Sequence, residues 1–225
     1  MSFTNKEGKL IVLNIIDTIQ KHKDYLSEID GAIGDGDHGI NMNKGVTIAK
    51  SQVDKNETLS EALCTLSCVL MEKIGGSMGP LYGSIFMGMQ AALGNAEYIN
   101  GAIIEKMLKQ AYDNIQMISP AKPGDKTLVD VLAPAVSAYA SVFEKTQDTC
   151  CSYSLLTGCR RGMQATCDMQ AKLGRASSER KINRSSGCSN LLLPDSADIL
   201  LNDNSVGKSF TKGDWRCSDL LTIRT

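Results

Sequence analysis

Three aspartates lie close together in one glycine-rich stretch of the chain. Asp30, Asp35 and Asp37 fall within eight residues, in the segment Asp30-Gly-Ala-Ile-Gly-Asp-Gly-Asp-His-Gly39. Their carboxylates repel one another, whereas Mg²⁺ prefers an octahedron of oxygen ligands and commonly keeps waters and substrate phosphates among them. The glycines permit a tight turn with positive φ angles, which would point the carboxylates inward. The pattern therefore predicts a Mg²⁺ site that serves a phosphorylated ligand.

Two other kinds of loop share this composition. An EF-hand calcium loop needs an acidic ligand at its twelfth position, and counting from Asp35 that position is Val46, which excludes an EF-hand. A solvated loop of Asx turns without a bound ion fits the same residues and stays open as an alternative. His38 directly follows the aspartates, and we expect it to face phosphate or the metal; the alternative is a polar loop residue without a role. Asn41 would face the same way if a helix begins near Gly39.

Two further glycine-containing loops each precede a predicted helix. They are Gly75-Gly-Ser-Met-Gly-Pro80 and Ser119-Pro-Ala-Lys-Pro-Gly-Asp-Lys-Thr127. A helix N-terminus presents unpaired N–H groups and a partial positive charge, which suit phosphate. Neither loop is a Walker A motif or a Rossmann fingerprint. Each alone is ambiguous, since the first also fits an ordinary turn and Asp125 in the second fits an N-cap. Together the three loops predict a phosphate-binding helical domain.

Apolar residues recur at helical spacing over most of the first 148 residues. Capping boxes at Thr4-x-x-Glu7 and Thr58-x-x-Glu61 mark the starts of the first two clear helices. No run alternates with a period of two, so no strand is predicted. The fold class is therefore predicted to be all-α, with apolar faces suited to a bundle. The predicted helices span about residues 6–26, 58–74, 83–94, 102–118 and 126–145.

The composition excludes several classes of function. The 225 residues are 42% hydrophobic and 22% charged, which is typical of a globular protein. A net charge of −1 and 5% aromatic residues indicate neither a nucleic-acid partner nor a membrane surface as partner. No signal peptide and no membrane-spanning stretch are recognised, so we expect a cytoplasmic protein. Cys64 and Cys68, four apart on a predicted helix, are interpreted as buried small apolar residues, with a metal site as the alternative.

The chain changes character near residue 149. Six of the eight cysteines lie in residues 149–225, and from about residue 186 no helical period is sustained. A tail rich in Ser, Asn and Asp cannot bury enough apolar surface to fold by itself. We therefore expect a helical domain over residues 1–180 and an atypical, disordered tail over residues 181–225.

Four segments, taken in order, resemble the nucleotide-binding L subunits (DhaL) of dihydroxyacetone kinases. The first segment is specific, and the four in this order are very specific; the resemblance covers roughly residues 5–180. It implies an antiparallel eight-helix barrel with a nucleotide at one rim. The segments are Ile33-Gly-Asp-Gly-Asp-His-Gly-Ile-Asn41, Gly75-Gly-Ser-Met-Gly-Pro-Leu-Tyr-Gly83, Pro123-Gly-Asp-Lys-Thr127 and Gly174-Arg-Ala-Ser177.

The resemblance also implies a role for individual residues. Asp30, Asp35 and Asp37 would hold two Mg²⁺ ions against the phosphates of ADP or ATP. No catalytic residue is implied on this chain, because the acceptor hydroxyl belongs to a substrate on another subunit. The residues implied to contact the nucleotide are His38, Gly39, Ile40, Asn41, Ser77, Met78, Ser119, Leu128 and Arg175.

In this family a separate K subunit holds dihydroxyacetone covalently through its own histidine. A free-standing L chain of this length resembles the phosphotransferase-system type, whose bound nucleotide is recharged by a phosphocarrier M subunit at the expense of phosphoenolpyruvate. In the ATP-dependent type the L-like domain is fused to the K-like one. The implied activity is phosphoryl transfer to an alcohol group, as a glycerone kinase subunit in glycerol metabolism. A homodimer is left open.

The chain departs from the family pattern in several places. Met78 replaces a common serine, which removes one hydroxyl that could bond phosphate, and Leu128 stands where the family often has Met. After Ser177 the family continues with a His-x-Asp-Pro-Gly segment that closes over the nucleotide, followed by a last helix. The Asp-Pro-Gly segment is missing here, so we expect that helix to be missing or disordered. The alternative function is therefore a non-catalytic, regulatory or decayed nucleotide-binding protein.

The cysteine-rich stretches also suggest an error of reading frame. Residues 150–161 contain three cysteines, and the residues beyond 178 share no pattern with the family. We hypothesise that both stretches derive from frame-shifted coding or a sequencing error, which resequencing and the intact mass would test.

Overall fold

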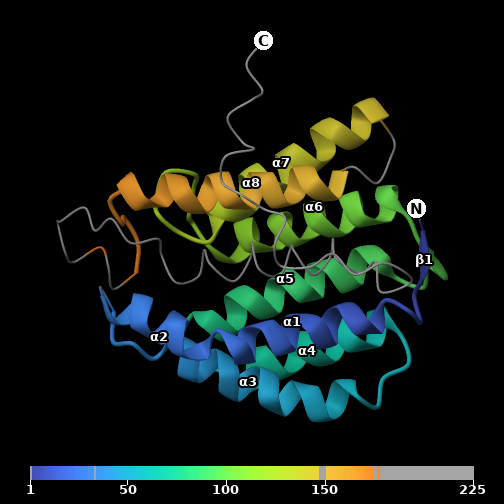
Figure 1. The fold of residues 1–225 in the computed structure, drawn as a ribbon, viewed down its shortest axis with the longest axis horizontal. Helices are drawn as coiled ribbons and strands as arrows, with labels where there is room; N and C mark the ends of the chain where they lie inside the picture. Colours follow the sequence, from blue (N-terminus) through green and yellow to red (C-terminus); the bar gives the residue numbers. More distant parts are fainter. Residues whose placement is uncertain (1, 33, 147–150, 175–176, 178–225) are drawn as a thin grey trace, which may run out of the picture.

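The computed structural model describes residues 2–32, 34–146, 151–174 and 177. Within these residues helices dominate, so the prediction of an all-α fold is confirmed (Figure 1). The tail over residues 181–225 and the family's last helix lie outside the described residues. The elements are β1 (Phe3–Thr4), α1 (Lys9–Lys21), α2 (Lys23–Gly31), α3 (His38–Val53), α4 (Leu59–Lys73), α5 (Met78–Leu93), β2 (Tyr98–Ile99), α6 (Gly101–Ile118), α7 (Val129–Thr146), α8 (Cys151–Ala165) and the 3₁₀ turn η1 (Thr166–Asp168).

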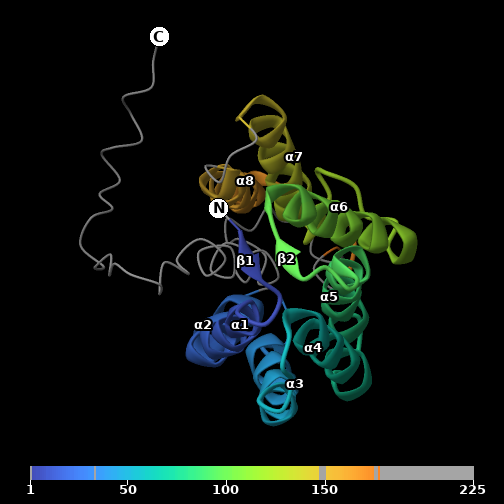
Figure 2. The same ribbon diagram turned by 90° about the vertical axis from the view of Figure 1, so that its right-hand side faces the viewer.

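The helices form an antiparallel bundle that is laid out along an arc. Each helix from α3 to α8 packs against the helix before it in the chain, and α1 lies against α3 and α4. Viewed along the helix axes, the arc runs from α1 and α2 through α3–α7 to α8 (Figure 2). Every described helix is too short or too polar to span a bilayer.

Because α2 continues in the direction of α1 and each later helix runs opposite to the one before it, the connections from α2 onward gather at two ends of the bundle (Figure 1). We call one end the rim: it contains the α2–α3, α4–α5 and α6–α7 loops and residues 166–174 after α8. The opposite end contains β1, β2 and the α3–α4 loop. All three predicted phosphate-facing loops therefore lie at the same end of the molecule.

The helix predicted over residues 6–26 is two helices. Thr4 and Glu7 do form the reciprocal bonds of a capping box, with Thr4 N–H donating to Glu7 Oε2 (2.8 Å) and Glu7 N–H donating to Thr4 Oγ1 (3.2 Å). However, α1 begins only at Lys9, after a turn. It ends at Lys21; the next residue, His22, has a φ of −100° and a ψ of 9°, outside the helical range, and α2 begins after it. The periodic spacing of apolar residues continues across a break of one residue, so the sequence pattern predicted one long helix instead of two.

The other helix predictions hold with shifted ends. The capping box of Thr58 and Glu61 is present at the start of α4. The helix predicted over 83–94 begins earlier, at Met78, and the helix predicted over 126–145 begins later, at Val129. Both errors fall at glycine-containing loops, where the periodic apolar signal is weak. The two strands pair antiparallel but are two residues each, too short to produce a sequence alternation.

The interior divides into a main core and a smaller second cluster. The main core joins α1 to α7 and includes Val12, Ile16, Met42 and Leu66, all fully buried. The second cluster joins α6, α7 and α8; its buried residues are Leu108, Val131, Ala135, Tyr139, Cys151, Leu155, Leu156 and Cys159.

Helix α8 includes most of the stretch suspected of a frame shift. Its backbone packs closely on α7 at Gly158. A Cβ atom at that position would lie only 2.7 Å from the carbonyl oxygen of Pro134. Leu155 and Leu156 are buried beside it. Residues 151–161 thus form a closely packed helix, and the frame-shift hypothesis itself remains untested.

The prediction that Cys64 and Cys68 are buried is wrong. Both thiols are exposed. Helix α4 buries a face that includes Leu59, Leu63, Leu66 and Leu70, and the two cysteines, spaced by four residues, lie together on another face.

Asn5 joins three segments at the opposite end of the bundle. Its side-chain amide donates to Ala96 O (2.9 Å) and accepts from Ser60 N–H (3.1 Å). Its backbone N–H donates to Glu97 O, and its carbonyl accepts from Leu59 N–H, both at 2.8 Å. These bonds tie the N-terminus to the start of α4 and to the chain before β2.

Candidate functional site

The structure brings the three predicted metal ligands together at the rim. One carboxylate oxygen from each of Asp30, Asp35 and Asp37 lies within 4.8 Å of the other two. Asp30 belongs to the last turn of α2, Asp35 to the following loop, and Asp37 immediately precedes α3. Asp30 and Asp37 are half-buried, whereas Asp35 is exposed. Three converging carboxylates are a donor set that fits a hard cation such as Mg²⁺.

Backbone and amide contacts fix the turn that carries these aspartates. Gly36 has a φ of +72°, a left-handed conformation that glycine adopts without strain, and it separates Asp35 from Asp37. The backbone N–H of His38 donates to Asp30 Oδ2 (3.4 Å). The side chain of Asn41 donates to Asp37 Oδ2 (2.8 Å). Asn41, predicted to contact the nucleotide, is thus found to orient a predicted metal ligand.

Gly39 lets the start of α3 lie directly against α2. A Cβ atom at this position would collide with the carbonyl oxygen of Lys23 and would lie 2.7 Å from Ser27 Oγ. Because α2 and α3 meet here without a side chain between them, Asp30 at the end of α2 and Asp37 at the start of α3 are neighbours. By contrast, Ile40 next to Gly39 is 66% exposed.

His38 points into the bundle and faces α5. Its side chain is buried, its Nε2 atom lies 3.4 Å from the hydroxyl of Tyr82, and the two rings meet edge to face. Burial lowers the pKa of His38 to about 4, against a smaller opposing effect of the Asp30 charge. The imidazole is therefore neutral near pH 7 and links the first turn of α3 to α5. Tyr82 was not among the predicted site residues, because its proximity to His38 depends on helix packing.

The second predicted loop leads directly into α5. Ser77 is exposed and precedes the helix, and its hydroxyl does not cap it. Gly76 before it has a φ of +69°. Met78 begins α5 and packs partly against the main core. Ser77 thus lies at the rim, and Met78 lies between the rim and the core.

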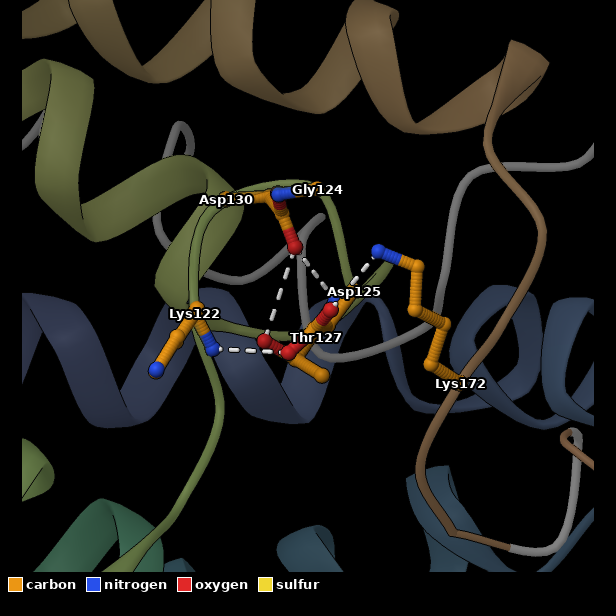
Figure 3. A network of polar contacts seen from close by, with 6 residues as sticks. All are labelled: Lys122, Gly124, Asp125, Thr127, Asp130 and Lys172. Atoms are coloured by element: carbon orange, nitrogen blue, oxygen red, sulfur yellow. Dashed lines mark hydrogen bonds and ion pairs between the residues drawn. The ribbon is translucent and has the colours of Figure 1, made fainter.

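The third predicted loop is held in place by Asp130, which was not among the predicted site residues. Asp130, buried in the first turn of α7, accepts from Gly124 N–H (2.5 Å) and from Thr127 N–H (2.7 Å) (Figure 3). Asp125 does not cap α7, because it lies four residues before it; its carboxylate accepts from Lys122 N–H (2.8 Å) instead. An acidic residue in a first helical turn was the available signal for Asp130.

The remaining predicted contacts lie at or beyond the third loop. Ser119 is half-buried at the end of α6, and its hydroxyl accepts from Ala121 N–H (3.2 Å). Leu128 is buried just before α7. Arg175 lies outside the described residues. The structure therefore gathers the described members of the predicted site at the rim.

Comparison with known proteins identifies related chains. A family model described as the DAK2 domain matches residues 32–189. The ADP-binding subunit DhaL of PEP-dependent dihydroxyacetone kinase 1 from Listeria innocua serovar 6a is 34% identical over 161 residues, which is 71% of this chain and 76% of that protein. The ADP-binding subunit DhaL of the PTS-dependent dihydroxyacetone kinase from Lactococcus lactis subsp. lactis is 39% identical over 115 residues, 50% of this chain and 57% of that protein.

Solved structures share the fold. The dihydroxyacetone kinase of C. freundii in its native form superposes with a TM-score of 0.68 at 19% identity, covering 89% of this chain and 35% of that one. The same kinase in complex with AMP-PNP and Mg²⁺ gives a TM-score of 0.66 at 17% identity, covering 90% of this chain and 35% of that one. This chain thus corresponds to about a third of that kinase.

Proposed function

The chain belongs to the DAK2 domain family, together with the DhaL subunits, and from this premise we propose that it is the adenine-nucleotide-binding subunit of a dihydroxyacetone kinase. It binds ADP or ATP with Mg²⁺ at the rim of the bundle. The nucleotide serves a phosphoryl transfer to dihydroxyacetone, which is held on a partner K subunit.

The convergence of Asp30, Asp35 and Asp37 is the observation that carries this proposal. These three aspartates hold two Mg²⁺ ions. When bound, Mg²⁺ offsets the negative charge of the nucleotide phosphates. Without a cation the three carboxylates repel one another, so a ligand that brings positive charge is favoured there.

The other rim residues position the nucleotide. Ser77 and Ser119 offer hydroxyls at two loops, and the neutral His38 holds the start of α3 in place. Met78 and Leu128 provide apolar surface. The residues from Gly39 to Asn41 and Arg175 complete the proposed contact set. Phosphoryl transfer depends mostly on positioning and charge stabilisation, so this role needs no nucleophile on this chain.

The names of the relatives support the proposed partners. Those proteins are described as ADP-binding subunits of PEP-dependent or PTS-dependent kinases. A subunit of that kind requires a second subunit for the acceptor, here the dihydroxyacetone-holding K subunit. A phosphocarrier M subunit recharges the bound nucleotide.

Calorimetric titration with ADP in the presence and absence of Mg²⁺ tests the nucleotide site. The wild-type chain should bind only with Mg²⁺, and Asp35→Ala should abolish that binding while the far-ultraviolet circular dichroism stays helical. Asp24→Ala, which removes an exposed aspartate of α2 outside the cluster, is the matched control and should bind normally. If Asp35→Ala binds ADP as the wild type does, the metal assignment is wrong.

Reconstitution then tests the reaction. The chain is mixed with a K subunit, an M subunit and a phosphoryl source, and dihydroxyacetone phosphate is measured. A second candidate function, a non-catalytic nucleotide-binding protein, is favoured by one observation: the sequence after Ser177 lacks the Asp-Pro-Gly segment. Mg²⁺-dependent ADP binding without any product would support this second function.

A further inference from the structure

Asp125 and Lys172 join two segments at the rim that are far apart in the chain. Lys172, in the segment after α8, donates from its ammonium group to Asp125 Oδ1 (3.0 Å) in the third loop. Its backbone N–H also donates to the carbonyl oxygen of Asp125 (3.2 Å). The same two residues thus meet through both backbone and side chain, although 47 positions separate them (Figure 3).

Asp125 is held firmly enough to serve as an anchor. Its second carboxylate oxygen, Oδ2, accepts from Lys122 N–H, and Asp130 fixes Gly124 and Thr127 on either side of it. The side chain of Asp125 is 15% exposed, against 61% for Lys172. The Lys122 N–H and then the Lys172 ammonium hold the pKa of Asp125 below its usual range, so the carboxylate is charged.

The next residue of the loop faces the same segment with the opposite charge. Lys126 is buried and has a φ of +59°, a left-handed conformation that side chains rarely adopt. Burial lowers the pKa of Lys126, while the neighbouring Cys167 and the Asp168 carboxylate in η1 raise it. Asp125 therefore pairs with Lys172, and the neighbouring Lys126 lies within electrostatic range of Asp168 in the same segment.

We propose that Asp125 and Lys172 form a clasp that positions the third loop for nucleotide binding without touching the nucleotide. The inference rests on the proposed function. Ser119 and Leu128, two proposed nucleotide contacts, lie at the two ends of this loop. Asp130 holds the loop on the side of α7, and the clasp holds it on the side of the segment after α8. A loop that is already ordered loses less conformational entropy when a ligand binds, so the clasp strengthens binding.

The clasp should have a moderate effect. One partner is exposed, and ion pairs of that kind contribute little individually, so we expect Mg²⁺–ADP affinity to fall by about three- to fivefold when the clasp is broken. Asp125→Asn removes the charge but keeps an oxygen for Lys122 N–H, and Lys172→Met removes the ammonium group. The double variant should lose no more affinity than either single variant, because both remove the same interaction.

The experiment uses the full chain, with calorimetric Kd for Mg²⁺–ADP and the melting temperature for each variant. Lys172→Arg, which keeps the positive charge, should restore the wild-type Kd. Lys50→Met is the matched control, since Lys50 pairs with Asp17 (2.6 Å) between two other elements. A parallel readout is the rate of thermolysin cleavage before Leu173, which is 38% exposed. Asp125→Asn should be cleaved faster than the wild type. Because this substitution leaves the sequence around the cleavage site unchanged, faster cleavage would report a looser segment after α8.

The outcomes separate this inference from the proposed function. Weaker binding with an unchanged melting temperature, and rescue by arginine, supports the clasp. Wild-type Kd values in Asp125→Asn and Lys172→Met overturn it. If the wild-type chain binds no Mg²⁺–ADP, the proposed function fails. In that case the thermolysin measurement still tests the clasp, and cleavage of Asp125→Asn at the wild-type rate rejects it.

Discussion

The two ends of the bundle are built from different kinds of contact. At the opposite end, Asn5 joins three segments through neutral hydrogen bonds, and β1 pairs with β2. At the rim, three carboxylates lie close together, and the third loop is tied to the segment after α8 by an ion pair. The hydrogen bonds of Asn5 at the opposite end need no ligand to complete them, whereas the rim contains like charges that a bound cation would offset. Substitution of Asn5 at the opposite end should therefore affect stability alone, whereas removal of a rim carboxylate should affect ligand binding.

Removing a rim carboxylate should produce the largest effect on binding. Asp37→Ala removes one of three converging ligands and the partner of the Asn41 side chain. We expect Mg²⁺-dependent ADP affinity to fall by about a hundredfold or more, equivalent to about 2.7 kcal/mol. Calorimetry gives the affinity, and urea unfolding with a chelator present should show no loss of stability, because a repelling charge has been removed. A large loss of stability would contradict the division between the two ends.

Lowering the pH should destabilise the rim through His38. The pKa of His38 is lowered to about 4 by burial, from an ordinary value of 6.5, so the unfolded chain binds a proton that the folded chain rejects. Above pH 6.5 His38 is neutral in both states and the free energy of unfolding is at its full value. As the pH falls from 6.5 toward 4, only the unfolded chain takes up the proton, and the free energy of unfolding falls by about 2 to 3 kcal/mol.

Urea unfolding in the presence of a chelator measures this effect across that pH range. Carboxylates also titrate there, so the comparison is with His38→Gln, which stays neutral. The difference in unfolding free energy between the two proteins should narrow as the pH falls. A difference that is independent of pH would contradict the buried, neutral state of His38.

Substitution of Asn5 should affect stability alone. Asn5→Ala removes two side-chain hydrogen bonds, to Ala96 O and from Ser60 N–H, at the opposite end of the bundle. We expect the free energy of unfolding to fall by about 2 kcal/mol. The Kd for Mg²⁺–ADP, measured below the melting temperature, should equal that of the wild type; a weaker Kd would show that the two ends are coupled.

The smallest effect is expected from the helix cap at the same end. Thr58 accepts a hydrogen bond from Glu61 N–H at the start of α4. Thr58→Ala should lower the free energy of unfolding by about 1 kcal/mol. Thermal melts provide the measurement, and Thr58→Ser, which keeps the hydroxyl, should restore most of the loss.

The sequence predicted those features that depend on local spacing. The aspartates are close in the chain, so their convergence needed only one turn, and the capping box of Thr58 is a local motif. Features that arise from packing were missed: the break at His22, the contact of Tyr82 with His38 and the hold of Asp130 on the third loop. The exposure of Cys64 and Cys68 was also misjudged, since spacing alone does not say which face of α4 is covered. The proposed nucleotide contacts remain predictions drawn from the family resemblance.

The bare backbone contact at Gly39 bears on which ion the rim selects. Since α3 lies directly on the carbonyl of Lys23, the carboxylates of Asp30 and Asp37 are attached at the ends of two closely packed helices. Ca²⁺ needs longer bonds and more ligands than Mg²⁺, and it favours flexible loops that can spread around it. A pair of ligands with a set spacing should therefore discriminate against the larger ion, so ion selectivity here would come from helix packing.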